Sequence, residues 1–391
     1  MNSFMVYAPT KLVFGVDSLK KLHEQVLPGK KALVVISNGR SVRKNGYLDS
    51  LVAELESAKK EYVIFDKIES NPTKDAVMNG AAFARENNCD FVVALGGGSV
   101  MDASKAIAAM ATNPGDLWDY VYGGTGKAQP LSAAPLPNIC ITTSAGTGSE
   151  VDPWGVVSNL DTQEKIGFGG DPRLFPTIAI VDPRLMLTVP KTFTAYQGFD
   201  ALFHSLEGYI SLAASDISDM YAAQAISAIG ANLARVVNNL GDLEGRSKIA
   251  YANTMSGYVM VVGGVTSEHS IEHAMSAFHH DLPHGAGLIM ISYAYFKHFV
   301  DAHSSDDRFV KMAQLLGNKE ASKPEDFLTG LKQLQEACGV ANLKMSDFGI
   351  KPEEFEGIAK NALETMGGLF TLDRVQIGVD DIVEILKESY K

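Results

Sequence analysis

The first half of the chain alternates short apolar runs with stretches of helical periodicity. Each apolar run is typical of a strand buried within a parallel sheet, and helical candidates separate the first four runs. This alternation predicts a doubly wound α/β sheet that binds its ligands at the carboxyl ends of the strands. The expected strands lie at 31–36, 62–65, 91–95, 138–142 and 177–181, and the expected helices at 49–59, 73–87 and 100–110.

The pattern changes after residue 183. From about Thr192 the apolar residues recur at helical spacing, and no β-branched run stands between turn signals. The sequence therefore predicts an α/β domain over residues 1–185 and an all-helical domain over 186–391. Helices are expected at 201–211, 216–234, 248–263, 267–277, 325–338, 352–362 and 380–388.

Composition narrows the classes of function. Among 391 residues, 46% are hydrophobic and 20% charged, which is typical of a globular protein. The formal charge of −12 argues against a nucleic-acid partner, because phosphate binding needs a dense basic surface. Cys89, Cys140 and Cys338 lie far apart, which suits a reducing compartment. We see neither a signal peptide nor an apolar run of about 18 residues, so we expect a cytoplasmic protein without a membrane partner.

A glycine-rich turn follows the third expected strand. Gly96-Gly97-Gly98-Ser99 leads into a helix, where free backbone N–H groups and the helix dipole suit a pyrophosphate. The motif is neither GxGxxG nor a P-loop, and the alternative is a tight turn that binds nothing. Its place after a central strand favours phosphate. On the next helix, Asp102 and Lys105 form either a surface pair or part of the cofactor groove.

Further polar loops follow neighbouring strands. Residues 142–150 combine hydroxyls, including Thr147 and Ser149, with glycines that together offer donors to phosphate or ribose oxygens. The alternative is a flexible linker. Asn71 precedes Pro72 and Thr73 in another strand-end turn, and Thr73 is a plausible helix N-cap. Because these loops converge on one edge of the sheet, they favour a dinucleotide site more than any one loop does.

The strongest chemical signal is a set of histidines with one aspartate. Asp200 and His204 lie four positions apart, so a helix would point both at one ion. His269 and His273 repeat this spacing, and His284 follows in a Pro-His-Gly sequence that we expect to be a loop. Imidazole with one carboxylate suits Fe(II) or Zn(II) rather than calcium or magnesium. Spacing alone leaves open which four of these residues bind the ion.

Together these motifs resemble the iron-dependent (group III) alcohol dehydrogenases, the family of lactaldehyde reductase and butanol dehydrogenase, whose architecture is shared with dehydroquinate synthase. The likeness spans nearly the whole chain. It is carried by residues 7–15 (YAPTKLVFG), Asn71-Pro-Thr, Gly96-Gly-Gly-Ser with Asp102 and Lys105, residues 142–150, residues 190–195, Gly198-x-Asp-Ala-x-x-His204 and Pro283-His-Gly.

The resemblance implies a role for each matching residue. It implies that residues 1–185 form a dinucleotide-binding domain and that residues 186–391 form a metal-binding and substrate domain. His273 would stand beside the nicotinamide as a proton relay or substrate contact. The family forms homodimers in which the first strand, here residues 5–14, crosses to the partner; the sequence equally allows an ordinary edge strand. The implied metal ligands are Asp200, His204, His269 and His284; the implied cofactor contacts are Gly97, Gly98, Ser99, Thr142, Thr143 and Lys165.

The expected function is a metal-dependent oxidoreductase that interconverts alcohols and aldehydes or ketones with NAD(P)(H). We expect Fe²⁺, with Zn²⁺ as the alternative. Ser37, Asn38, Gly39, Arg40 and Ser41 follow the first strand and contain no carboxylate for a ribose 2′-hydroxyl. Arg40 and Ser41 would bind a 2′-phosphate, which favours NADP(H), unless Arg40 simply points into solvent.

Rival functions remain open at this point. A zinc-dependent glycerol dehydrogenase-like enzyme normally has fewer protein ligands at its metal. A non-redox lyase of the dehydroquinate synthase type would need a more basic pocket than residues 200–284 supply. A non-catalytic metal-binding protein would leave the glycine loops unexplained.

Overall fold

A computed structural model describes residues 4–391, and this part of the chain divides into two compact units. One unit runs from Ala8 to Thr188 and contains a parallel sheet with helices. The other unit is helical and holds Val189–Lys391 together with the first described residues, up to Tyr7. The assignment of a dinucleotide to one unit and a metal to the other stays a prediction.

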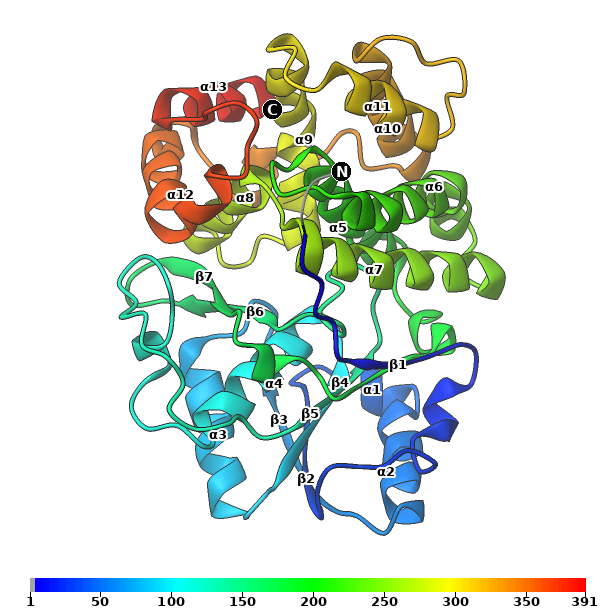
Figure 1. The fold of residues 1–391 in the computed structure, drawn as a ribbon, viewed down its shortest axis with the longest axis vertical. Coiled ribbons are helices and arrows are strands. Elements are labelled where there is room, and N and C mark those ends of the chain that lie inside the picture. Colours follow the sequence, from blue (N-terminus) through cyan, green and yellow to red (C-terminus); the bar gives the residue numbers. More distant parts are fainter. Residues whose placement is uncertain (1–3) are drawn as a thin grey trace. The chain divides into compact units, whose positions relative to one another are not determined.

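Six strands of the described chain form the parallel sheet, in the order β1-β8-β5-β4-β2-β3 (Figure 1). Every strand expected from the apolar runs belongs to this sheet, which confirms the predicted fold class. An additional strand, β1, pairs in parallel with β8 at the edge of the sheet. The strands are β1 (Lys11–Phe14), β2 (Lys31–Ser37), β3 (Glu61–Ile68), β4 (Phe91–Gly96), β5 (Asn138–Thr142) and β8 (Ile178–Val181).

Helices cover both faces of the sheet. On one side, Leu51 and Leu55 of α2 (Tyr47–Ser57) pack with Val34 and Val93 in a continuous core, close to the short α1 (Ser41–Lys44). Helices α3 (Lys74–Glu86) and α4 (Gly98–Met110) lie on the other side (Figure 1). Because both faces are covered, the central strands are apolar at successive positions instead of alternating.

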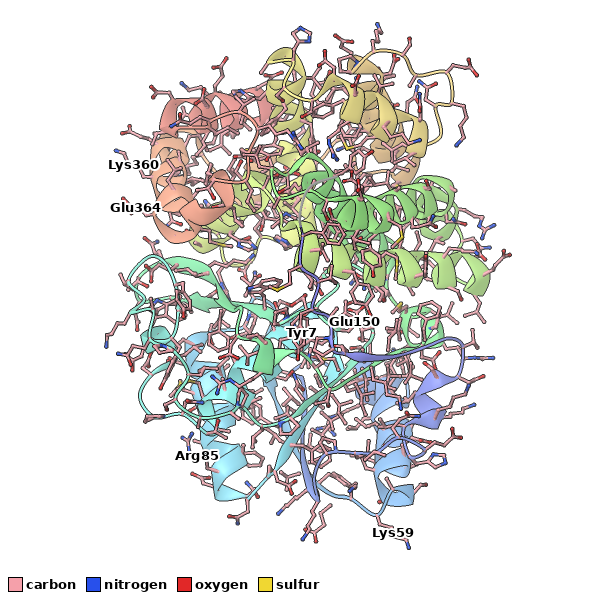
Figure 2. The ribbon with its side chains drawn as sticks, viewed as in Figure 1. Tyr7, Lys59, Arg85, Glu150, Lys360 and Glu364 are labelled. Carbon is pink, nitrogen blue, oxygen red and sulfur yellow. The ribbon has the colours of Figure 1, made fainter. Side chains whose placement is uncertain are left out.

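Helices α3 and α4 are also joined at their ends. Arg85, near the end of α3 (Figure 2), donates from Nη1 to the carbonyl of Met110 at 2.6 Å. Met110 is the last residue of α4, so the guanidinium satisfies a carbonyl that the helix leaves unpaired.

A hairpin that the sequence did not predict follows β5. It consists of β6 (Trp154–Asn159) and β7 (Glu164–Gly169), which pair antiparallel. The hairpin is anchored to the turn after β3, where Thr73 bridges to Ser158. Thr73 is the N-cap of α3, as expected, and accepts from the Ala76 N–H at 3.3 Å.

As far as it is described, the helical unit contains every helix expected from the periodicity and two further α-helices. Helices α9 and α10 were not anticipated, and α5 begins at Lys191 rather than at residue 201. Within residues 4–391 we find no helix whose length and apolarity would let it cross a membrane. The helices are α5 (Lys191–Ile210), α6 (Asp216–Asn238), α7 (Leu243–Gly263), α8 (Ser267–Phe278), α9 (His284–Asp301), α10 (Asp306–Leu315), α11 (Glu325–Cys338), α12 (Phe355–Phe370) and α13 (Val379–Ser389).

An aromatic cluster fixes α5 against α9. The rings of Phe203 on α5 and Phe296 on α9 lie 6.2 Å apart, and both residues are buried. Phe296 also contacts Phe327 of α11 at 5.3 Å and Phe309 of α10 at 6.5 Å. Such tilted and edge-on aromatic pairs stabilise a core beyond their buried area. The cluster therefore sets the distance between two helices that carry candidate metal ligands.

The glycine turn packs tightly on the loop after β5. Gly97 is the N-cap of α4, and Gly98 is its first residue. A Cβ on Gly98 would lie 2.3 Å from Cγ2 of Thr147, and one on Gly97 would lie 3.0 Å from Oγ of Ser144. Only glycine lets the start of α4 approach the loop this closely.

Gly98→Ala is expected to lower the free energy of unfolding by about 1–3 kcal/mol, because its methyl group forces the turn and the loop apart. Denaturant unfolding followed by circular dichroism measures the change. Gly368→Ala is the matched control, because among the described residues no atom outside its own helix backbone lies within 4 Å of the added methyl group. That variant should be neutral or slightly stabilising. Unchanged stability of Gly98→Ala would contradict the close approach.

Candidate metal centre

Helix α5 presents acidic and imidazole side chains on one buried face. Asp200 and His204 are one helical turn apart, and both are buried. His204 Nδ1 lies 3.6 Å from Asp200 Oδ1. Glu207 lies one turn further along the same helix and is fully buried. The expected i, i+4 pair is therefore on one helix face, with another carboxylate behind it.

The other candidate ligands come from α8 and α9. His269 and His273 lie on α8 and are both buried. The expectation that His284 lies in a loop is wrong, because it is the first residue of α9, after Pro283. The next residue, Gly285, explains how α9 reaches α5: a Cβ there would lie 2.3 Å from the Tyr196 carbonyl oxygen.

Asp200 Oδ1 is the meeting point of these side chains. His269 Nε2 and His284 Nε2 each lie 3.5 Å from it. The donor atoms of Asp200, His269 and His284 all lie within 4.8 Å of one another. A tetrahedral first-row ion with bonds of about 2.1 Å separates its ligand atoms by about 3.4 Å. The spacing therefore suits a divalent cation with nitrogen and oxygen ligands.

Unsatisfied polar atoms in the cluster also suit a cation. Asp200 Oδ1 and His269 Nε2 are buried, and within residues 4–391 neither has a hydrogen-bond partner. Buried polar atoms normally have hydrogen-bond partners. These two atoms are therefore suitable ligands for a bound cation. The His204 ring stacks on the His269 ring with centroids 4.3 Å apart, so the His204 imidazole also lies beside these two atoms.

Two carboxylates orient the imidazoles from behind. Glu207 binds Nδ1 of His269, and Glu272 binds Nδ1 of His284. In both residues Nε2 then faces Asp200 Oδ1, an arrangement that commonly fixes metal-binding histidines. The backbone N–H of Thr266 donates to Glu207 at 3.0 Å. Sequence reasoning missed both glutamates, although Glu207 lies three positions after His204 and Glu272 stands one position before His273.

The charges of the cluster are strongly coupled. Burial acts to raise the pKa of Asp200, but His204, His284 and His269 hold that pKa well below 3.8. Burial acts to lower the pKa of His269, but Glu207 and Asp200 raise it to about 10. In the metal-free protein these neighbours therefore favour the positively charged His269 ring, with a proton on both nitrogens. A cation that binds here displaces one of these protons.

His273 lies beside the cluster with a different partner. Its ring centroid is 5.2 Å from that of His284 and 6.2 Å from that of His269. Its Nδ1 lies 2.8 Å from the sulfur of Met366. Met366 has non-helical backbone angles within α12 (φ −129°, ψ 35°), so a kink occurs at this contact. The geometry places His273 outside the group centred on Asp200, and Met366 is a neighbour that the sequence did not indicate.

Most of the predicted cofactor residues lie near the carboxyl ends of the parallel strands. Because β5, β4, β2 and β3 are adjacent and parallel, the segments that follow them all begin at the same end of the sheet. Asn38 to Ser41 are exposed, whereas Ser37 is half-buried. Lys165 lies on β7 instead, is buried, and is opposite Ser158 in the hairpin register. The segments contain Ser37, Asn38, Gly39, Arg40 and Ser41 after β2, Asn71 after β3, Gly97, Gly98 and Ser99 after β4, and Thr142, Thr143, Thr147 and Ser149 at the end of β5 and beyond.

Some of these polar groups already serve the loop itself. The Thr142 hydroxyl donates to the Ser144 carbonyl at 2.8 Å, and the Ser149 N–H donates to Thr147 Oγ1 at 3.3 Å. The interpretation of Asp102 and Lys105 as a surface pair is wrong, because both are buried. Burial raises the pKa of Asp102 to about 6.

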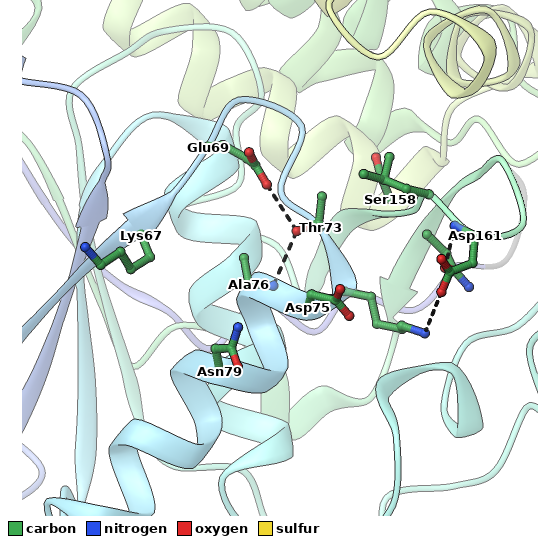
Figure 3. A pocket seen from close by; sticks show the side chains of 11 residues that line it. Lys67, Glu69, Thr73, Asp75, Ala76, Asn79, Ser158 and Asp161 are labelled. Carbon is green, nitrogen blue, oxygen red and sulfur yellow. Dashed lines mark hydrogen bonds and ion pairs between the residues drawn. The ribbon is translucent and has the colours of Figure 1, made fainter.

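A pocket of about 460 Å³ opens beside the turn after β3 (Figure 3). Thr73 and Ser158 lie in its wall, and the Thr73 hydroxyl donates to Glu69 at 3.1 Å. The lining mixes the positive charges of Lys67 and Lys74 with acidic side chains, so no single charge dominates. The acidic members are Glu69, Asp75 and Asp161.

Comparison with known proteins matches both halves of the chain to one family. Residues 9–183 match the model described as iron-containing alcohol dehydrogenase. Residues 194–390 match the model of the C-terminal region of the Fe-containing alcohol dehydrogenase family. The chain belongs to the iron-containing alcohol dehydrogenases. It is therefore an NAD(P)-dependent alcohol–aldehyde oxidoreductase with a divalent metal.

Relatives of this alcohol dehydrogenase resemble it over their full length. It is 32% identical to the probable NADH-dependent butanol dehydrogenase 1 of Bacillus subtilis, with all of both chains covered. It is also 32% identical to the 1,3-propanediol dehydrogenase of Klebsiella pneumoniae, over 99% of each chain. Among solved structures, an archaeal halo-thermophilic alcohol dehydrogenase from a Red Sea brine pool matches with a TM-score of 0.94 and 31% identity, over 99% of each chain.

Glu207→Gln is expected to weaken metal binding about 10- to 100-fold, because a neutral amide orients His269 less firmly than a carboxylate does. Titration of the metal against a competing chelator measures the affinity. Glu354→Gln is the matched control, since Glu354 lies 3.0 Å from His279 Nε2, away from Asp200. Equal metal affinity in both variants would exclude an orienting role for Glu207.

Proposed function

We propose that this alcohol dehydrogenase holds a divalent first-row cation between Asp200, His204, His269 and His284 and interconverts short primary alcohols and aldehydes. The observation that carries the proposal is the set of imidazole nitrogens 3.5–3.6 Å from Asp200 Oδ1. The substrate class is supported by the relatives named as butanol dehydrogenase and 1,3-propanediol dehydrogenase.

The proposed chemistry divides between the bound groups and the chain. When bound, the cation supplies a Lewis acid that lowers the pKa of an alcohol hydroxyl, and the nicotinamide supplies the hydride acceptor. Glu207 and Glu272 keep the imidazoles of His269 and His284 aimed at Asp200. His273, next to His284, takes up or returns the hydroxyl proton.

The same proposal assigns the cofactor to the strand-end loops of the α/β unit. The N-terminus of α4 at Gly97 and Gly98 suits the pyrophosphate, because free backbone N–H groups and the helix dipole attract anions there. Ferrous iron is the proposed metal, as the family description indicates. Zinc suits the same ligands and competes effectively for them.

We also propose a homodimer, for which the N-terminal segment offers support. Residues 4–7 expose apolar side chains, with Met5 88% exposed, and β1 is an edge strand. An exposed strand edge is a surface on which another chain can pair. A cytoplasmic location stays a prediction from the sequence.

The activity is tested by following absorbance at 340 nm with butanol, 1,3-propanediol and the corresponding aldehydes. The chelator-treated protein is expected to lose turnover, and Fe(II) or Zn(II) should restore it. His269→Ala should lose both bound metal and turnover, because it removes a ligand from a buried site. His279→Ala is the control, since His279 contacts Glu354 instead. Full activity of His269→Ala would refute the assigned metal site.

Substitution of Arg40 tests which nicotinamide cofactor the enzyme uses. Arg40 is exposed in the segment between β2 and α1, and the stretch from Ser37 to Ser41 carries no carboxylate, which supports NADP(H). The name of the Bacillus subtilis relative, NADH-dependent, supports NAD(H) instead. If Arg40 binds a 2′-phosphate, Arg40→Ala should raise KM for NADPH about tenfold or more and leave KM for NADH unchanged. Equal effects on both cofactors would remove the case for NADP(H).

A further inference from the structure

Tyr295 is a fully buried tyrosine on α9, and its hydroxyl lies among polar groups. The hydroxyl donates to Thr266 Oγ1 at 2.9 Å and accepts from the Ser267 hydroxyl at 3.2 Å. Asp373 Oδ1 lies further from it, at 3.3 Å. Burying a hydroxyl is costly unless hydrogen bonds satisfy it. The partners of Tyr295 therefore indicate what its hydroxyl holds in place.

Thr266 connects this hydroxyl to the candidate metal centre. It is the N-cap of α8, but its side chain does not cap that helix in the described structure. Instead the Thr266 hydroxyl donates to Glu207 Oε2 at 3.2 Å, and the Thr266 backbone N–H donates to the same oxygen at 3.0 Å. The other oxygen of Glu207 binds Nδ1 of His269. A chain of hydrogen bonds therefore runs from Tyr295 through Thr266 and Glu207 to His269.

The hydrogen atoms of this chain fit one direction. Each hydroxyl has a single hydrogen, so Tyr295 uses its hydrogen on Thr266 and Thr266 uses its hydrogen on Glu207. A carboxylate only accepts, so Glu207 receives Thr266 on one oxygen and His269 on the other. Hydrogen bonds in such a chain polarise one another, so loss of the first bond weakens those that follow. The Tyr295 hydroxyl thus acts on Glu207 through Thr266.

Aromatic contacts hold the ring of Tyr295 in place. Its centroid lies 5.2 Å from that of Phe296 and 5.1 Å from that of Phe299, and both contacts are edge-on. Phe296 belongs to the aromatic cluster that packs α9 on α5. The Tyr295 hydroxyl is therefore presented to Thr266 from a packed helix, which positions a group more precisely than a loop does.

The segment after α12 fixes the helix ends on either side of the Thr266–Glu207 contact. Asp373 Oδ1 accepts from the N–H of Ser267, the first residue of α8, at 3.2 Å. The next residue, Arg374, donates to the carbonyls of Ile210 at 2.7 Å and Ser211 at 3.1 Å, at the end of α5. These two bonds satisfy backbone groups that helix ends leave unpaired. One short segment therefore holds the start of the helix with His269 and the end of the helix with Glu207.

We propose that Tyr295 is a positioning residue for the metal ion, which fixes the carboxylate of Glu207 through Thr266 and thereby the ring of His269. Groups behind a metal-binding histidine set the direction of its ring, and their loss lowers metal affinity. Tyr295 lies two hydrogen bonds away from Glu207, so its effect is smaller than that of Glu207 itself. The inference rests on the proposed function, since it takes His269 to bind the cation.

The test compares variants of the full chain that differ by single hydroxyl groups. Tyr295→Phe removes the hydroxyl and keeps the aromatic ring with its contacts. Thr266→Val removes the hydroxyl that Glu207 binds and keeps the backbone N–H. Thr266→Ser is the conservative variant, which keeps both groups. Tyr293→Phe is the matched control, because Tyr293 lies on the same helix and is 40% exposed.

The measured quantities are the Kd for Zn(II) in competition with a chelator, the visible absorption spectrum of the Co(II)-loaded protein, and the thermal unfolding of the metal-free protein. Tyr295→Phe is expected to raise the Kd about three- to tenfold, which is less than the effect of Glu207→Gln. It should also shift the Co(II) absorption bands, because a turned imidazole changes the ligand field of the ion. Thr266→Val should raise the Kd at least as much. Thr266→Ser and Tyr293→Phe should stay close to the wild type.

The double variant Tyr295→Phe/Thr266→Val tests the route of the effect. Residues that act through one network have effects that do not add. If Tyr295 acts through Thr266, the double variant should bind Zn(II) about as weakly as Thr266→Val alone. Fully multiplied effects on the Kd would show that Tyr295 does not act through Thr266, and would overturn the proposal.

The outcomes separate the two proposals. If the wild type binds neither Zn(II) nor Co(II), or if His269→Ala binds them equally well, the proposed metal site fails and the positioning role fails with it. If metal binding depends on His269 but Tyr295→Phe leaves either the Kd or the Co(II) spectrum unchanged, only the positioning role is overturned. A lower unfolding temperature with an unchanged Kd also overturns it, because that result shows a structural role alone. If Tyr295→Phe does not fold, Thr266→Val decides, and an unchanged Kd in that variant refutes the role of Tyr295.

Discussion

The buried carboxylate of Asp200 is the group on which the helical unit depends. A carboxylate taken out of water loses several kcal/mol of solvation, so it requires positive charge nearby. The neighbouring imidazoles of His204, His284 and His269 lower the pKa of Asp200. Because these residues come from α5, α8 and α9, satisfying one carboxylate fixes where three helices meet.

The next layer of carboxylates explains how the cluster can exchange protons for a metal. Glu207 and Glu272 stand behind His269 and His284, so each imidazole lies between two negative groups. This environment raises the pKa of His269 to about 10. The same negative charge stabilises a divalent cation once the imidazole proton has left. The cluster is therefore compensated in both states, which allows the helices to keep one arrangement.

Sequence reasoning reached the fold and the centre of the site because both are local patterns. Apolar runs revealed the strands, and the four-residue spacing of Asp200 and His204 placed them on one helix face. The start of α9 was missed because Pro283 and Gly285 resemble a turn, although proline also precedes helices and Gly285 is needed for contact with α5. Glu207 and Glu272 were missed because their role depends on distances between side chains, which spacing does not supply.

The α/β unit faces a different physical problem from the helical unit. Gly97 and Gly98 let the backbone approach an anion, but glycine also loses the most conformational freedom on folding. A turn made of glycines therefore needs rigidity from its surroundings. Helix α4 provides it from both directions, because Gly98 contacts Thr147 while Lys105 and Asp102 hold Ser149 two residues later. Buried polar groups of α4 thus hold the loop that faces the glycine turn.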